Sequence, residues 1–168
     1  MERFENKVVF LTGAATGIGE ATAKRMAGEG ASLYIVDVDK SELEKTAQEC
    51  RRLGANVESE VCDVSDEAEV SGSVNNMLEL FGKVNVVANV AGIQLWHHTS
   101  DHPTIDFERT LAVNLTGTFL VCRELIPYLL ETKGSIVNVS STTALAGIPY
   151  SAAYAASKAG VLALTKSL

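Results

Sequence analysis

The chain alternates between short apolar runs and longer segments in which apolar residues recur at helical spacing. Each of these short segments is six to ten residues long and is bounded by polar or glycine-rich stretches. Runs of this kind are typical of strands that are buried on both faces of a sheet. Strands are therefore predicted at Lys7–Thr12, Ser32–Asp37, Asn56–Val64, Lys83–Gly92 and Gly134–Ser141.

A helix is predicted after each strand. Ser41 and Glu44 have the spacing of a capping box at the start of the second helix, and Ser65 is the expected N-cap of the third. A long helix is expected from about Thr104 to Leu130, with Pro127 bending its last turn, and a final helix begins near Tyr154.

Strands that alternate with helices in this way indicate an α/β fold with a parallel sheet. Right-handed crossovers then give a doubly wound, Rossmann-type sheet, for which we expect the strand order 3-2-1-4-5. Residues 1–168 are interpreted as a single dinucleotide-binding domain. A ligand is expected at the carboxyl ends of the strands, where a glycine-rich turn, strand-end acids and a pair of serines are located.

The segment TGAATGIG, residues 12–19, joins the first strand to the first helix. Its glycines, Gly13, Gly17 and Gly19, allow a tight turn and let backbone N–H groups approach a pyrophosphate, with Thr16 and Ile18 between them. The spacing is G-x-x-x-G-x-G and differs from the strict G-x-G-x-x-G fingerprint. Taken alone, the turn fits a phosphate site and a plain glycine-rich connection equally well.

The second strand ends on an acid, Asp37, which lies eighteen residues after Gly19. A carboxylate near that distance can accept hydrogen bonds from an adenosine ribose, and it would repel a 2′-phosphate. Val38 follows it and no arginine stands beside it. We therefore predict NAD as the cofactor rather than NADP, although a strand-end acid can also be solvated without a ligand.

Composition narrows the class of protein. Apolar residues make up 46% of the 168 residues, which is ordinary for a globular protein, and the net charge of −7 argues against nucleic-acid binding. No stretch has the length of a membrane span or of a signal-peptide core, so no membrane partner is expected. The three cysteines lack zinc or CxxC spacing, which favours reduced thiols and a cytoplasmic location.

Several motifs, taken in order along the chain, resemble the short-chain dehydrogenase/reductase family of the Tyr-x-x-x-Lys type. TGAATGIG is similar to its cofactor turn, NVAG (residues 89–92) to its Asn-Ala-Ala-Gly segment, and YAASK (residues 154–158) to its catalytic pair. Val90 replaces an alanine of the family pattern. The resemblance covers the whole chain, and it implies further strands beyond Leu168, so we expect the chain to be C-terminally incomplete.

The resemblance implies four catalytic residues, Asn114, Ser141, Tyr154 and Lys158. Tyr154 and Lys158 are four apart on a helix and share a face, so the cation can favour the phenolate of a general acid/base. Ser141, thirteen residues before Tyr154, would orient the substrate oxygen. Ser140 is its rival, because only one of two successive strand residues points to the site.

In the family, the asparagine positions a water beside the lysine, and this role falls to Asn114. The resemblance also implies that Asp63 and Val64 contact adenine. Together with the turn, the implied cofactor contacts are Gly13, Thr16, Gly17, Ile18, Gly19, Asp37, Asp63, Val64, Asn89, Ala91, Gly92, Tyr154 and Lys158.

The segment after the fourth strand is expected to form the rim of the substrate site, with Gln94, Trp96 and His97 near the substrate. The histidines of this segment could also suggest a metal site, but loop histidines are more often solvated, and no metal is predicted. The segment 142–150 is expected to line the other side, and its small and apolar residues suggest a partly hydrophobic substrate.

The sequence therefore predicts an NAD-dependent oxidoreductase that interconverts a secondary alcohol and a ketone. A non-catalytic dinucleotide-binding sensor or scaffold, or an inactive fragment, remains open as an alternative. By analogy with the family, the long helix and the final helix are expected to form a homodimer or homotetramer.

Overall fold

The computed structural model describes residues 3–168. The strands are β1 Val8–Thr12, β2 Ser32–Asp37, β3 Val57–Val61, β4 Val86–Asn89 and β5 Ser135–Asn138. The helices are α1 Gly17–Ala27, α2 Lys40–Arg52, α3 Glu67–Phe81, η1 Thr99–Asp101, α4 Thr104–Leu111, η2 Ala112–Thr116, α5 Gly117–Thr132, α6 Thr143–Ala146 and α7 Ala152–Ser167.

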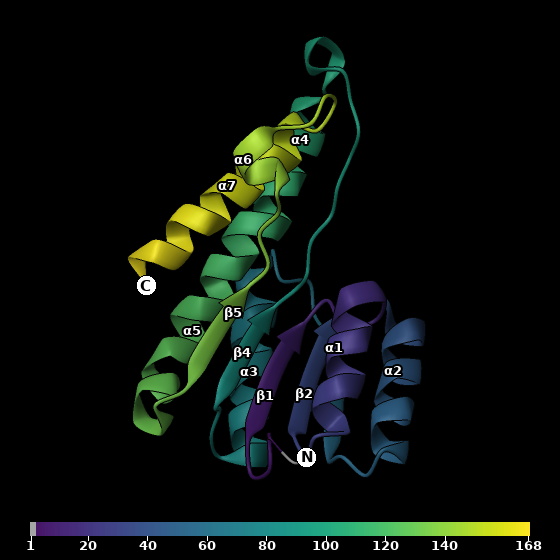
Figure 1. Ribbon diagram of the computed structural model, residues 1–168, viewed down its shortest axis with the longest axis vertical. Helices are drawn as coiled ribbons and strands as arrows, with labels where there is room; N and C mark the ends of the chain where they lie inside the picture. Colours follow the sequence, from purple (N-terminus) through teal and green to yellow (C-terminus); the bar gives the residue numbers. More distant parts are fainter. Residues whose placement is uncertain (1–2) are drawn as a thin grey trace.

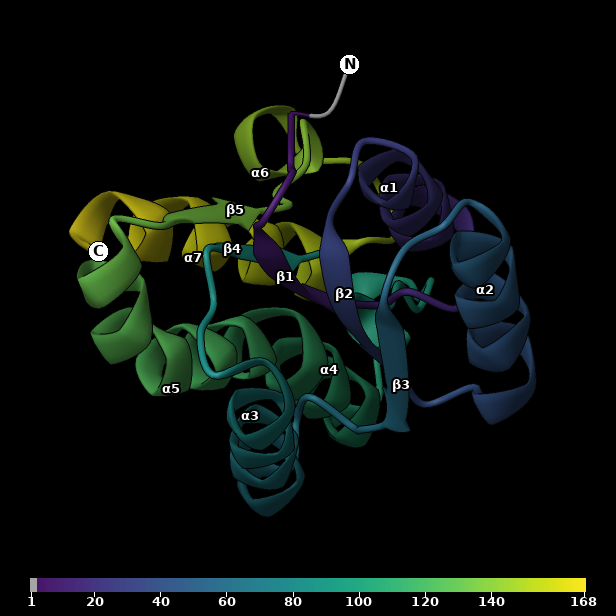
Figure 2. The same cartoon turned by 90° about the horizontal axis from the view of Figure 1, so that it is seen from below.

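The five strands form one parallel sheet in the order β3-β2-β1-β4-β5, as the alternation of strands and helices predicts. Figure 1 shows β2, β1, β4 and β5 of this sheet, and Figure 2 shows all five strands. The register places Thr12, the last residue of β1, beside Val36 and Asn89. The carboxyl ends of the central strands therefore lie at one level and form one edge of the sheet.

Helices cover the sheet on both faces, as seen along the strands in Figure 2. One core lies between the sheet and the helices α3 and α5, and Phe10, Val87 and Leu125 belong to it. The other core lies under α1 and α2, and it contains Leu11 and Ile35. Alternate residues of β1 thus enter opposite cores, which explains why the strand reads as a continuous apolar run.

Three of the predicted strands are too long at their carboxyl ends, because β3, β4 and β5 stop at Val61, Asn89 and Asn138. After β4 the backbone leaves the ladder: the amides of Val90 and Ala91 donate to Oγ1 of Thr12 over 3.1 and 3.2 Å. The Thr12 side chain thus takes the place of the β1 backbone as hydrogen-bond partner of these two amides. The apolar sequence pattern continues through Val90 and Ala91, although the strand has ended at Asn89.

The two predicted N-caps are wrong. Asp39 caps α2 and Asp66 caps α3, and in each case one carboxylate oxygen accepts two amides of the first turn. Ser65 instead donates its amide and its hydroxyl to Asp63. An ionised carboxylate accepts these bonds more strongly than a hydroxyl. Ser41 lies two residues after Asp39 and Ser65 lies directly before Asp66, so the sequence pattern offers two N-cap candidates at each helix.

The predicted long helix is continuous in space but changes its winding in the middle. Between α4 and α5 the segment η2 is π-helical, and the amide of Gly117 donates to the carbonyl of Ala112, five residues earlier. Pro127 lies inside α5, which runs on to Thr132. The short elements η1 and α6 are not predicted by the sequence. Over residues 3–168, no helix is long and apolar enough to cross a membrane.

Candidate active site

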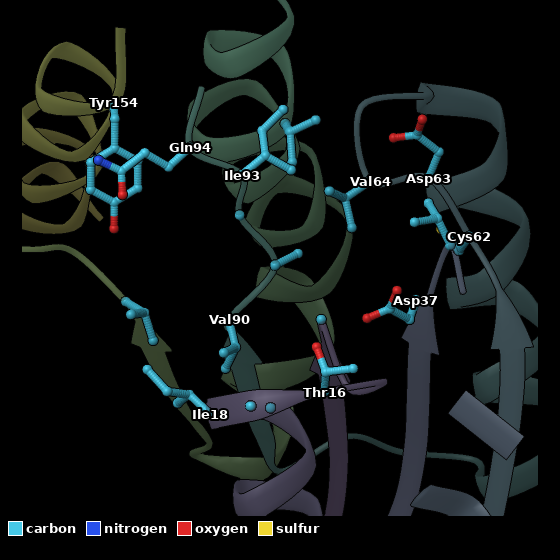
Figure 3. Close-up of a pocket in the computed structure, with 18 of the residues that line it drawn as sticks. Thr16, Ile18, Asp37, Cys62, Asp63, Val64, Val90, Ile93, Gln94 and Tyr154 are labelled. Atoms are coloured by element: carbon cyan, nitrogen blue, oxygen red, sulfur yellow. The ribbon is translucent and has the colours of Figure 1, made fainter. Parts of the chain in front are cut away.

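A cavity of about 500 Å³ opens at the carboxyl ends of the strands (Figure 3). In Figure 3, Tyr154 and Gln94 lie at one side of it, Asp37 and Asp63 lie at the other, and Thr16 and Ile18 lie between them. Of the expected cofactor contacts, all but Asn89 line the cavity: Gly13, Thr16, Gly17, Ile18, Gly19, Asp37, Asp63, Val64, Ala91, Gly92, Tyr154 and Lys158.

Each glycine of the turn before α1 has its own structural reason. A Cβ on Gly13 would lie 2.6 Å from the amide nitrogen of Ala91, and one on Gly19 would lie 1.8 Å from the carbonyl oxygen of Gly13. Gly17 has open space around it, but its φ of +59° is left-handed. The turn thus packs tightly against the backbone after β4 and leaves Gly17 bare toward the cavity.

The N-terminus of α1 faces the cavity without a side-chain cap. Thr16 is its N-cap residue and makes no capping hydrogen bond, whereas Asp39 and Asp66 cap α2 and α3. The first-turn amides of α1 are therefore free of a side-chain partner and carry the positive end of the helix dipole. With the bare glycine backbone beside them, they fit the pyrophosphate of a dinucleotide.

Asp37 is held in place by two backbone amides. Its Oδ2 accepts from Ala15 and its Oδ1 accepts from Asp39, each over 3.0 Å. These bonds fix the carboxylate at the end of β2 and keep it on the cavity wall. The Asp37 side chain thus presents a carboxylate in a fixed position beside Ala15 of the glycine turn.

At the end of β3, Asp63 takes part in a network that the sequence did not reveal. Its Oδ1 accepts from the amide and the hydroxyl of Ser65, and its Oδ2 accepts from Arg109 over 2.7 Å. Arg109 also donates to the hydroxyl of Ser65 over 2.6 Å. The hydrogen bonds from Ser65 and Arg109 outweigh desolvation and lower the pKa of Asp63.

Arg109 lines the cavity and comes from α4, far along the chain from Asp63. Its position four residues before Val113, another lining residue, places both on one helical face. This four-residue spacing is the only sequence signal for Arg109. It identifies Arg109 as a site residue only when the contact between α4 and the end of β3 is known.

Tyr154 and Lys158 lie on the same face of α7, as their spacing predicts. The ammonium of Lys158 lies 5.8 Å from the centre of the Tyr154 ring and donates to the carbonyl of Val139 over 2.8 Å. Lys158 is 3% exposed. Burial lowers its pKa, and no carboxylate among residues 3–168 forms a salt bridge with it.

Asn114 is buried in the π-helical segment and does not line the cavity itself. Its Oδ1 accepts from the amide of Ile93 over 2.8 Å, and its Nδ2 donates to the carbonyl of Ile93 and to the hydroxyl of Ser157. A Cβ on Gly92 would lie 3.2 Å from Oδ1 of Asn114 and 3.3 Å from Nζ of Lys158. The carboxamide and the ammonium therefore flank the same glycine.

The two serines after β5 have different partners. Ser140 donates its hydroxyl to the carbonyl of Lys158 over 2.8 Å, and Ser141 shares a hydrogen bond of 2.8 Å with the hydroxyl of Thr143. The strand has already ended at Asn138, so the alternation of strand side chains does not decide between them. Ser140 is committed to the backbone of α7, and neither serine is on the wall of the cavity.

Asn89 lies behind the cavity wall and joins two strands. Its Nδ2 donates to Oδ1 of Asn138 on β5 over 2.8 Å and contacts Sγ of Cys122 at 3.3 Å. It is 4% exposed. Its place in the structure is thus that of a support for the ends of β4 and β5.

The expected substrate residues do not stay together. Gln94 lines the cavity, whereas Trp96 is 57% exposed and lies outside it. His97 is bound elsewhere, because its Nε2 lies 2.9 Å from Asp106 and its amide donates to Tyr150. Within residues 3–168, no group of three or more histidines, cysteines or acids is arranged to hold a metal ion.

Comparison with known proteins gives a consistent result. The sequence pattern of the short chain dehydrogenases matches residues 7–168. Over the whole of the present chain, the sequence is 41% identical to the uncharacterized oxidoreductase YxbG of Bacillus subtilis. Over 99% of the present chain, it is 35% identical to meso-2,3-butanediol dehydrogenase of Serratia marcescens. A crystal structure of NAD⁺-bound xylitol dehydrogenase superposes on 98% of the chain with a TM-score of 0.95 and 37% identity.

The chain spans 62%, 65% and 64% of the lengths of these three proteins, respectively. The matched region contains the glycine turn, the asparagine segment after β4 and the Tyr-x-x-x-Lys pair, in the order in which the structure brings them around one cavity. The chain belongs to the short-chain dehydrogenase/reductase family.

Proposed function

We propose that this protein is an NAD-dependent oxidoreductase that interconverts a secondary alcohol and a ketone, with Tyr154 as the general acid/base. The observation that carries this proposal is the buried ammonium of Lys158 beside the Tyr154 ring at the wall of the cavity. A cation placed there without a carboxylate partner stabilises a phenolate more than a phenol. Residues 1–168 would act as one dinucleotide-binding domain.

The bound NAD supplies the hydride acceptor for alcohol oxidation. Tyr154 takes the proton from the substrate hydroxyl in that direction and returns it in the other. Ser141 orients the substrate oxygen, for which its hydroxyl must turn from Thr143 toward the substrate. Asn114 holds the loop that carries Gly92 and Ile93 at the cavity wall, and we propose that it keeps a water beside Lys158.

The fit of NAD is supported by the glycine turn in the middle of the cavity and by the side that carries Asp37. The uncapped first turn of α1 and Gly17 suit the pyrophosphate, and the fixed carboxylate of Asp37 suits a ribose with free hydroxyls. Arg109 also lines the cavity, but Asp63 and Ser65 hold its guanidinium. The NAD⁺-bound state of the related xylitol dehydrogenase is in keeping with this cofactor.

The experiment is a screen for NADH formation from NAD⁺ and a panel of secondary alcohols. The panel should include polyols and vicinal diols, because the names of two relatives refer to xylitol and to 2,3-butanediol. Tyr154→Phe is the control, since it keeps the ring and removes the proton-transferring hydroxyl. Turnover that is no faster in the wild type than in this variant, on every alcohol, would rule out the proposed reaction.

The cofactor preference has its own test in titrations with NADH and NADPH. Tighter binding of NADH is expected, and Asp37→Ala should reduce the difference. Tighter binding of NADPH to the wild type would overturn the role given to Asp37. NADH binding without turnover of any alcohol would instead favour a sensor or scaffold.

Two further proposals concern the molecule in the cell. We propose a cytoplasmic location, in keeping with the free, buried thiols of Cys50, Cys62 and Cys122. We also propose assembly into a homodimer or homotetramer through α4, α5 and α7, which light scattering after gel filtration would test.

A further inference from the structure

Ser157, the residue before Lys158, is completely buried and has two polar partners. Its hydroxyl accepts from Nδ2 of Asn114 over 3.0 Å and donates to the carbonyl of Tyr154 over 2.7 Å. The bond to Tyr154 alone would be the ordinary contact of a helical serine with the preceding turn. The bond from Asn114 is different, because its donor lies on another helix, 43 residues away.

Asn114 extends the contact to a third segment. The same carboxamide bonds both the amide and the carbonyl of Ile93, in the loop that follows β4. A continuous set of hydrogen bonds thus runs from the backbone of Ile93, through Asn114 and Ser157, to the backbone of Tyr154. It joins the wall of the cavity to the helix that carries Tyr154 and Lys158.

At the start of α7, the N-cap residue Ser151 makes no capping hydrogen bond with its side chain. Its amide and its hydroxyl both donate to the carbonyl of Ile148, three residues earlier, so these bonds are local. Lys158 is tied to the segment after β5, through its own carbonyl and through its ammonium. The peptide of Tyr154, one turn earlier, is tied to the rest of the site by way of Ser157.

Close packing makes this geometry sensitive. A Cβ on Gly160 would lie 2.7 Å from Cδ2 of Leu115, so α7 packs closely against the π-helical segment and a larger residue would require the Leu115 side chain to move. Because the two helical segments lie this close together, the hydroxyl of Ser157 on α7 can directly accept the hydrogen bond from Asn114 of the π-helical segment. Removing it leaves one N–H of the buried Asn114 without a partner, which is costly.

We propose that Ser157 is a positioning residue that holds the phenol of Tyr154 over the ammonium of Lys158, by coupling α7 to Asn114 and the loop after β4. This inference rests on the proposed function, in which Tyr154 transfers the proton. Ser157 itself touches neither substrate nor cofactor. Its hydroxyl acts through the backbone of Tyr154 and through Asn114.

The test compares Ser157→Ala with Ser167→Ala in the full chain. Ser167 lies on the same helix, donates to the carbonyl of Ala163 over 3.1 Å and is exposed, so its replacement controls for the loss of a helical serine. For Ser157→Ala we expect kcat to fall about tenfold, while the dissociation constant of NADH stays within about twofold of the wild-type value.

The pH profile separates positioning from a general loss of structure. A phenol that is less well placed over a cation ionises at higher pH, so the acidic limb of kcat for alcohol oxidation should move to higher pH in Ser157→Ala. It should not move in Ser167→Ala. A fall in kcat with an unmoved pH profile would mean a merely structural role and would overturn the proposal.

Hydrogen exchange tests the coupling without any turnover. Loss of the Ser157 hydroxyl should speed amide exchange both at the start of α7 and at residues 92–94, whereas Ser167→Ala should leave both segments unchanged. If the wild type oxidises no alcohol, the proposed function fails, and exchange alone decides the coupling. Exchange at residues 92–94 that does not change would overturn it.

A second variant covers the case in which Ser157→Ala does not fold. Ser157→Cys keeps nearly the same volume and replaces the hydroxyl by a thiol, which forms weaker hydrogen bonds. For Ser157→Cys we expect changes in kcat, pH profile and amide exchange in the same direction as for Ser157→Ala, but smaller. A Cys variant that equals the wild type in all three would count against the proposal.

Discussion

Gly17 and Gly19 stand two residues apart in one turn, and a methyl group would meet different surroundings at each. At position 19 it would lie 1.8 Å from the carbonyl oxygen of Gly13, whereas at position 17 it would meet no protein atom within 4 Å. The glycine at 19 is needed for the turn itself. The glycine at 17 is needed for its left-handed backbone and, under the proposed function, for the pyrophosphate that would approach from the cavity.

The variants Gly19→Ala and Gly17→Ala should therefore fail in different ways. Gly19→Ala should lower the free energy of unfolding by about 3 kcal/mol or more, since backbone must move. Gly17→Ala should cost about 1 kcal/mol for its positive φ, yet weaken NADH binding at least about tenfold by standing between the backbone and the pyrophosphate. Denaturant unfolding and NADH titration measure the two effects. A Gly17→Ala variant that binds NADH normally would contradict a pyrophosphate at this turn.

Lys158 should make the stability of the fold depend on pH. Burial lowers the pKa of its ammonium below the ordinary value of 10.5, so the unfolded chain binds more protons than the native one between these two values. Stability relative to Lys158→Met should consequently rise with pH in that window, by at most about 1.4 kcal/mol per pH unit. Below the native pKa the difference should stay constant, because both states are then fully protonated.

Thermal unfolding of both proteins from pH 7 to pH 10.5 provides the measurement. The methionine also loses the hydrogen bond to Val139, which adds an offset that does not change with pH. Lys166→Met is the matched control, since Lys166 is exposed in the last turn of the same helix. A difference between wild type and Lys158→Met that is flat across the whole range would refute the effect of burial.

At the scale of elements, the segment α4–η2–α5 brings together parts of the site that are distant in sequence. Arg109 of α4 reaches Asp63 after β3, and Asn114 of η2 reaches Ile93 after β4. Gly117 allows the close approach, because a Cβ there would lie 2.9 Å from the carbonyl oxygen of Val64. The π-helical segment, Ala112–Thr116, contains Asn114, the residue whose side chain bonds the loop at Ile93.

The family resemblance implies that Asp63 contacts adenine, so Arg109→Gln should weaken the binding of ligands that carry adenine. Without the guanidinium, Asp63 loses a partner of its Oδ2 and is less firmly held at the cavity wall. Because the pair is partly exposed, the dissociation constants of NADH and of ADP-ribose should rise by only about threefold to tenfold. The affinity for nicotinamide mononucleotide should not change.

Isothermal titration with the three ligands measures these affinities. Arg123→Gln is the control, because Arg123 pairs with Glu67 and Glu124 and does not line the cavity. An equal loss of affinity for nicotinamide mononucleotide would place the effect of Arg109 elsewhere than at the adenine end.

The predictable part of the fold followed from local patterns. β1 and β2 were predicted nearly to the residue, since buried apolar runs such as VVFLT and SLYIVD end at a glycine or an acid. The ends of β4 and β5 were not, because Thr12 and Lys158 supply hydrogen bonds from far along the chain. The partners of Arg109 and Ser157 likewise depend on contacts between elements, which periodicity does not encode.

At the scale of the whole sheet within residues 3–168, its two edges differ in how well they resist pairing. The edge strand β3 carries Glu58 and Glu60, whose charges discourage a further strand. The edge strand β5 has the sequence SIVN and no charge. Val137 is paired in register with Ala88, on the face whose core lies under α1 and α2, and no residue of β5 belongs to that core.

Val137 is 53% exposed on this face, so a protein made of residues 1–168 alone should self-associate through β5. Val137→Lys should weaken the association through β5, because an exposed lysine at a strand edge opposes both pairing and apolar contact. Leu53→Lys is the matched control: Leu53 is also 53% exposed, but it lies at the end of α2. Sedimentation velocity over a range of concentrations should show a weaker association for Val137→Lys alone. An equal shift in both variants would trace the association to general surface hydrophobicity, and no shift in either would locate it away from β5.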